Sequence, residues 1–155
     1  MTTLPVRPAA RVIALDGDGR VLLLRYEENG GFWATPGGSL DRGEGHTAAL
    51  RRELGEELGV DGERVRLGPQ LAERTTDHKV GDGDVRQIER YYIARLTEAD
   101  LNLAQATQPD TITATRWWSI DDLNSTRETV YPLGLGDLIT SYQTQGAPER
   151  PTILR

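Results

Sequence analysis

The chain has 155 residues, a formal net charge of −6 and no cysteine. Its length predicts one domain over residues 1–155 with a substantial core, and its acidity gives no basic footprint for duplex nucleic acid. The lack of cysteine excludes disulfides, a thiolate nucleophile and a zinc–thiolate site. No apolar run approaches the ~18 residues of a membrane span, and the start lacks the apolar core of a signal peptide, so we expect a cytoplasmic protein.

The first third of the chain is typical of short strands joined by turns. Two apolar runs, Arg11–Leu15 and Val21–Leu24, flank Asp-Gly-Asp-Gly at positions 16–19, which is a strong hairpin signal. A calcium loop would need the later ligands of the EF-hand spacing, which are missing, so a turn is favoured. A short strand over Phe32–Thr35 leads to the turn Pro36-Gly37-Gly38, where glycine lets the backbone approach a ligand closely.

A helix crowded with carboxylates is predicted between Gly45, a weak cap, and Gly59. At about 100° per residue, Glu53 and Glu57 lie roughly one turn apart, with Glu56 beside them. Like charges at this spacing each cost a few tenths of a kcal/mol, so we expect a hard divalent cation such as Mg²⁺ to offset them. A solvated helix face is the simpler reading of an isolated pair, but the glycine turns before the helix favour a site. An apolar stripe can dock the helix on a sheet: Leu50, Leu54 and Leu58.

The stretch from Gly38 to Val60 resembles the Nudix box. Gly38, Glu44 and the run Arg52–Val60 match the box at every defined position. The resemblance implies an α/β fold, a Nudix-type α/β/α sandwich with a mixed central sheet, and hydrolysis of a diphosphate linkage with Mg²⁺, for which Mn²⁺ can substitute. It also implies that Gly37 and Gly38 lie beside the diphosphate and the metals as substrate-binding residues.

The box supplies the candidate catalytic residues and metal ligands. Glu53 and Glu57 are the first choices as metal ligands, and Glu56 is a third ligand or the base that takes the proton of the attacking water. By resemblance, Glu44 assists the metal cluster directly or through water. Arg52 is expected to align Glu44 or Glu56 by an ion pair. The catalytic set is therefore Arg52, Glu56 and Glu57, and the metal set is Glu44, Glu53, Glu56 and Glu57.

Many members of the resembled family recruit another carboxylate from outside the box. Glu89 and Asp110 are the candidates here, placed in the substrate site, with Glu98 as a weaker third. His46 is expected to be exposed to solvent; His78 could touch substrate, although a surface residue is the simpler reading of a lone loop histidine. Most of the aromatic residues are expected to pack in the core, because both faces of the sheet should be covered.

The rest of the chain is expected to complete the sheet and the second helical layer. A polar excursion over residues 76–84 is predicted to be a mobile loop, and a tail from Ala147 is expected to be loosely attached. The expected strands are Val65–Arg74, bent at Gly68-Pro69, then Val85–Leu96 and, after an irregular stretch over 97–111, Thr115–Trp118. The expected helices are a short one capped by Ser119 and running through Leu123, and one that begins at Pro132 and ends just before Gly146.

The leading functional hypothesis is a metal-dependent hydrolase of a nucleoside diphosphate linked to another moiety. The proline of some ADP-ribose hydrolases would fall near Thr75, and the tyrosine of some dinucleoside polyphosphate hydrolases within residues 76–78; both are missing. Nucleoside triphosphates, including oxidised ones, are therefore candidate substrates, and ADP-ribose stays open. The alternative is a non-catalytic module that senses nucleotides. The isomerase branch of the fold typically relies on a cysteine, and this chain has none, which argues against that activity. The resemblance also leaves a homodimer open as the assembly.

Overall fold

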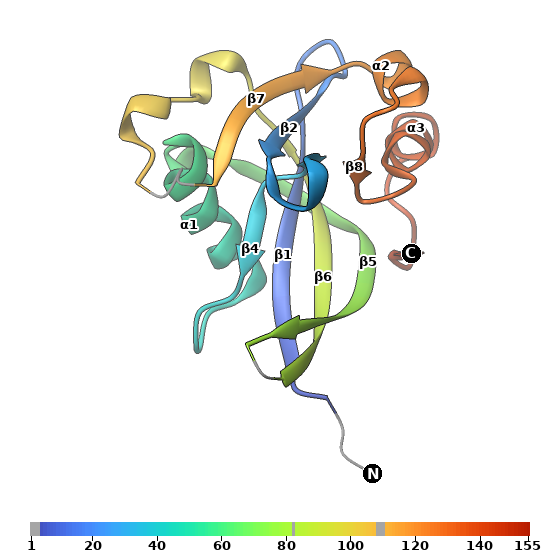
Figure 1. The fold of residues 1–155 in the computed structure, drawn as a ribbon. Helices are drawn as coiled ribbons and strands as arrows, with labels where there is room; N and C mark the ends of the chain where they lie inside the picture. The colour runs from blue at the N-terminus through green and yellow to red at the C-terminus, as the bar shows by residue number, and fades with distance from the viewer. Residues whose placement is uncertain (1–3, 82, 108–110) are drawn as a thin grey trace.

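The computed structural model describes residues 4–81, 83–107 and 111–155 (Figure 1). These residues form a nine-stranded sheet in the order β8-β3-β2-β1-β6-β5-β9, with β4 paired to β1 and β7 paired to β2. The strands are β1 (Val6–Leu15), β2 (Val21–Tyr26), β3 (Phe32–Ala34), β4 (Gly37–Ser39), β5 (Arg66–Val80), β6 (Gly83–Arg95), β7 (Ile112–Trp118), β8 (Val130–Tyr131) and β9 (Thr152–Leu154). The helices are α1 (His46–Leu58), α2 (Ile120–Ser125) and α3 (Leu135–Gln145).

Strand β1 is the centre of the sheet. It runs parallel to β6 along its full length and antiparallel to β2 and β4. Successive side chains of a strand point to opposite faces. Accordingly, Val12 and Ala14 pack in the apolar cluster that contains α1, whereas Ile13 and Leu15 pack in the cluster that contains α3. Figure 1 shows α1 on one side of the sheet and α3 on the other. The predicted α/β/α sandwich with a mixed central sheet is confirmed.

Helix α1 has the bounds that its glycines predict. It begins after Gly45 and ends at Gly59, whose φ of +67° is left-handed and whose N–H donates to the carbonyls of Gly55 and Leu54. A Cβ at Gly59 would overlap the carbonyl oxygen of Asn102, so only glycine fits there. The helix docks through side chains that are at most 1% exposed: Leu50, Leu54 and Leu58.

Residues 76–80 and 83–84 of the polar stretch lie in strands, and the prediction of a mobile loop there is wrong. Strands β5 and β6 pair as far as Val80↔Gly83, in a long ribbon that projects from the sheet (Figure 1). Asp77 and Arg86 face each other across this ribbon, with Arg86 Nε 2.9 Å from Asp77 Oδ1. Because much of the ribbon contacts solvent on both faces, it lacks the apolar alternation by which strands are recognised in a sequence.

The C-terminal segment also differs from expectation. Helix α3 begins at Leu135 rather than at Pro132, because Gly134 has a left-handed φ of +81° and breaks the chain direction before the helix. The tail is attached, since β9 pairs in parallel with Ala72–Arg74 of β5. Pairing at a sheet edge uses backbone N–H and C=O groups. The side chains of so short a strand therefore do little to reveal it in the sequence.

The two glycines of the predicted turn Pro36-Gly37-Gly38 instead begin β4, whereas the cap of α2 and the bend of β5 agree with the sequence. Ser119 caps α2, its side chain accepting the Asp122 N–H at 3.0 Å. Register shifts next to Gly68 and Pro69 mark the expected bend in β5. Across the described ranges, no helix combines the length and apolar character needed to cross a bilayer.

Candidate active site

The carboxylates of α1 meet the backbone of β4. Glu57 is 8% exposed; its Oε1 accepts the Gly37 N–H at 2.9 Å, and its Oε2 accepts the Tyr26 hydroxyl at 3.4 Å. Burial raises the pKa of Glu57 to about 7; the Glu53 carboxylate adds to the rise, and the Gly37 N–H opposes it. Burial is also the main reason why the pKa of Glu53 is raised. The helix therefore presents two carboxylates whose ionised form is disfavoured by burial.

Strand β4 has no side chain where these acids lie. Gly37 has a φ of +138°, which favours glycine, and a Cβ there would overlap the carbonyl oxygen of Ala10 in β1. A Cβ at Gly38 would lie 2.6 Å from Glu53 Oε1. The two glycines form a cradle for the α1 carboxylates that a side chain would fill.

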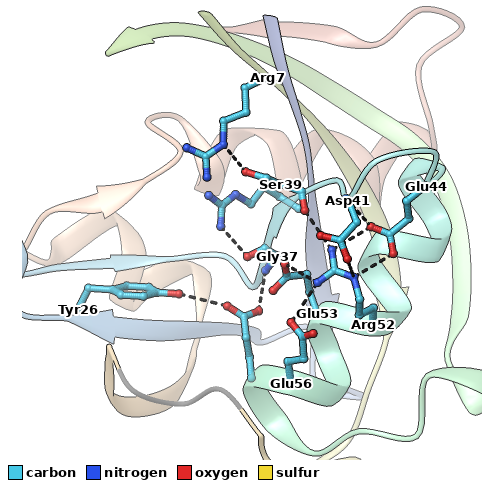
Figure 2. A network of polar contacts seen from close by, with 11 residues as sticks. Arg7, Tyr26, Gly37, Ser39, Asp41, Glu44, Arg52, Glu53 and Glu56 are labelled. Atoms are coloured by element: carbon cyan, nitrogen blue, oxygen red, sulfur yellow. Dashed lines mark hydrogen bonds and ion pairs between the residues drawn. The ribbon is translucent and has the colours of Figure 1, made fainter. Parts of the chain in front are cut away.

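Arg52 binds four carboxylates around this cradle (Figure 2). Its Nε and Nη2 each lie 2.9 Å from an oxygen of Glu44, and its Nη1 lies 3.1 Å from Glu53 Oε1 and 3.0 Å from Glu56 Oε2. Asp41 Oδ2 is 3.2 Å from Nε. The Arg52 hydrogen bonds are the main reason why the pKa of Glu44 falls to about 2. Both partners expected for Arg52, Glu44 and Glu56, are thus present, while its catalytic role stays a prediction.

The donor set fits a hard divalent cation. In the part of the chain that the structure describes, no three acidic or histidine side chains converge as a ready metal site; Glu53 and Glu56 share the guanidinium of Arg52 instead. Carboxylate oxygens are nevertheless the ligands that Mg²⁺ takes. Positive charge beside Glu57 and Glu53 would also lower their raised pKa values. Glu44, Glu53, Glu56 and Glu57 remain the predicted ligand set.

The carboxylates proposed from outside the box have different surroundings. Both oxygens of Glu89 are bonded to arginines, with Arg11 Nε at 2.8 Å and Arg74 Nη1 at 3.3 Å, and the residue is 4% exposed. Glu98 accepts the indole N–H of Trp117 at 2.7 Å. Asp110 lies outside the described residues. Glu89 is therefore a partner of two arginines, an arrangement that competes with metal ligation.

A cavity of about 230 Å³ opens beside β4, on the α3 side of the sheet. Arg11 connects it to the acids, because its Nη1 donates to the Gly37 carbonyl at 3.0 Å. His78, expected on the surface, is exposed and borders this cavity, 3.3 Å from Gln87 Oε1. Of the other cavity residues, the sequence predicted Glu89 in the substrate site, and the lone arginine of apolar β1, Arg11, was a further usable signal. The lining includes Arg11, Phe32, Arg74, Gln87, Glu89 and Tyr131.

Known proteins resemble this chain in sequence and in fold. The family model of the NUDIX domain matches residues 5–134. The RNA pyrophosphohydrolase of Sphingopyxis alaskensis is 31% identical over 129 residues, covering 77% of this chain and 82% of that protein. That of Roseobacter denitrificans is 32% identical over 136 residues, covering 77% and 81%.

Among solved structures, the MutT protein of Methanosarcina mazei Go1 has a similar fold. The TM-score is 0.67 at 19% identity, over 93% of this chain and 97% of that one. At this identity the likeness shows the fold alone. The class of reaction rests on the family match and on the identity to the two RNA pyrophosphohydrolases. The chain belongs to the Nudix hydrolase family and is a hydrolase of pyrophosphate bonds.

Proposed function

We propose that this protein hydrolyses the polyphosphate of a nucleotide with magnesium as its cofactor. The observation that carries the proposal is the buried Glu57 carboxylate, which lies close enough to Glu53 for the two charges to repel and rests on the backbone of β4. Two such carboxylates call for a cation. The adjoining cavity has room for the nucleoside part of the substrate.

The residues of the acid cluster, defined as Glu44, Glu53, Glu56 and Glu57, have separate tasks in this proposal. Glu53 and Glu57 would hold the cation, assisted by Glu44, and Glu56 would accept the proton of the attacking water. Arg52 keeps Glu44 and Glu56 in place through its ion pairs. When bound, the cation polarises the phosphoryl oxygens and neutralises charge on the leaving phosphate.

The substrate class is a nucleotide that carries at least a diphosphate. The name of the two relatives, RNA pyrophosphohydrolase, supports a 5′-phosphorylated RNA end. A free nucleoside triphosphate offers the same polyphosphate on a smaller body, and the cavity of about 230 Å³ suits a small body. We take the free nucleotide as the leading substrate and the RNA end as the second.

The test is product formation from a substrate panel, with Mg²⁺ or with EDTA, measured as phosphate or pyrophosphate from the triphosphates and as AMP and ribose 5-phosphate from ADP-ribose. The panel contains nucleoside triphosphates, oxidised ones included, ADP-ribose and a 5′-triphosphorylated oligoribonucleotide. We expect turnover of at least one nucleotide, only with the metal, and its loss in E56Q. A folded protein that binds a nucleotide and never cleaves it would instead be the sensing module. Equal turnover in EDTA would remove the metal from the proposal.

A further inference from the structure

Gly37 connects the acid cluster to the cavity through its two backbone polar groups. Its N–H donates to Glu57 Oε1 at 2.9 Å, and its carbonyl accepts from Arg11 Nη1 at 3.0 Å. Arg11 Nε donates in turn to Glu89 Oε2 at 2.8 Å. Arg11 and Gly37 are direct partners in the β1–β4 register, so the sheet itself brings them together.

A charged residue such as Arg11 is unexpected in the apolar strand β1 unless its contacts with Gly37 and Glu89 have a function. Every other residue from Ala9 to Leu15 is buried and apolar. The Arg11 side chain is 21% exposed and that of Glu89 is 5% exposed, so both charges lose most of their hydration. Replacing a buried ion pair by apolar residues is often neutral or stabilising. A contribution to stability therefore does not by itself explain why this pair is present.

The backbone at Gly37 gains a restraint from the Arg11 side chain in addition to the β1–β4 pairing. Glycine adopts many backbone conformations at little cost, and the peptides on either side of Gly37 carry the surface on which Glu57 and Glu53 rest. The Val12 N–H holds the Pro36 carbonyl at 2.9 Å and so fixes the preceding peptide. Arg11 holds the Gly37 carbonyl and so fixes the following peptide, at whose end Gly38 faces Glu53.

We propose that Glu89 and Arg11 are positioning residues for the acid cluster, acting through Gly37. Glu89, itself held by Arg74, orients the guanidinium of Arg11; Arg11 fixes Gly37; and Gly37 fixes the carboxylate of Glu57. The inference rests on the proposed function, because it assigns the pair to the readiness of Glu57 to hold a cation. It gives Glu89 a role without metal ligation.

The key variant is R11K in the full chain. Lysine keeps the positive charge that Glu89 needs, but its compact ammonium lacks the planar fork with which arginine reaches two acceptors. The matched control is R90K, because Arg90 also pairs with a glutamate of a neighbouring strand, Glu73 of β5 at 4.0 Å, and takes no part in the contacts that lead to Gly37. E89Q is the second variant, which preserves the shape of the side chain should R11K fail to fold.

Three readouts separate positioning from direct substrate contact. Mn²⁺ uptake by calorimetry without substrate should weaken about tenfold or more in R11K, as is usual for residues behind metal ligands. On the best nucleotide, kcat should fall by a similar factor while KM stays within about threefold. Hydrogen exchange of the Gly37 amide should accelerate. E89Q should change all three in the same direction, and R90K should leave them as in the unsubstituted protein.

Several results would overturn the inference. A rise in KM with unchanged kcat and Mn²⁺ uptake in R11K would make Arg11 a substrate contact, and unchanged values throughout would make the pair structural. If the unsubstituted protein neither takes up Mn²⁺ nor hydrolyses a nucleotide, the proposed function fails. Exchange at Gly37 still decides in that case, because equal rates in R11K and the unsubstituted protein would show that Arg11 does not order this backbone.

Discussion

Replacing Glu57 by glutamine should stabilise the protein at alkaline pH in the absence of metal. Glu57 is 8% exposed and its pKa is raised by burial from an ordinary 4.5 to about 7. Folding therefore disfavours the ionised carboxylate, and E57Q removes that ionisation. The amide oxygen of glutamine can still accept the Gly37 N–H, and its NH₂ can donate to the Tyr26 hydroxyl oxygen.

The size and the sign of the effect follow from proton linkage. Each pKa unit corresponds to 1.36 kcal/mol, so the rise amounts to a penalty of about 3 kcal/mol at most. The folded-state pKa lies above the unfolded-state value. The penalty is thus absent below pH 4.5, grows as the pH rises and is complete above pH 7. Between pH 5 and pH 8 the free energy of unfolding of E57Q should gain on that of the unsubstituted protein by about 1–3 kcal/mol.

The assay is urea unfolding followed by tryptophan fluorescence, in EDTA, at pH 5 and pH 8. The control is E63Q, because Glu63 is exposed and lies outside the acid cluster. Adding Mg²⁺ at pH 8 should stabilise the unsubstituted protein more than E57Q, since a ligand stabilises the state that binds it. The linkage argument would be refuted if E57Q and the unsubstituted protein differed in stability by the same amount at both pH values. It would also be refuted if E57Q were less stable than the unsubstituted protein at pH 8.

Three further substitutions probe other contacts of the site and of α1. G38A should lower kcat about tenfold to a hundredfold with little change in urea midpoint, because the new Cβ would lie 2.6 Å from Glu53 Oε1 and push this carboxylate out of the cradle. Unchanged kinetics would show that Glu53 need not lie in the cradle. R52Q should raise the pKa of Glu44 from about 2 toward its ordinary 4.5, which a carboxyl ¹³C titration measures, and a pKa that stays near 2 would assign the shift to another group. G59A should reduce the free energy of unfolding by at least about 1 kcal/mol, since its φ is +67° and Asn102 occupies the space; an unchanged value in thermal or urea unfolding would contradict the cap.

The sequence by itself determined the features that depend on local spacing. The bounds of α1 follow from Gly45 and Gly59, and its docking follows from leucines four residues apart. The crowding of Glu53, Glu56 and Glu57 on one helix was visible for the same reason, since helical geometry relates residues less than two turns apart. The resemblance to the Nudix box added the sandwich fold and the class of reaction.

Only the tertiary structure decided which distant residues complete the site. Arg11 and Glu89 are 78 positions apart and meet because β1 and β6 run in parallel, a register that leaves no local trace in the sequence. The strand residues 76–80 and 83–84 were hidden likewise, because strands exposed on both faces carry no apolar alternation. The spacing of apolar residues in a segment indicates which of its faces packs on the core. Contacts between distant polar groups depend instead on how the whole chain folds.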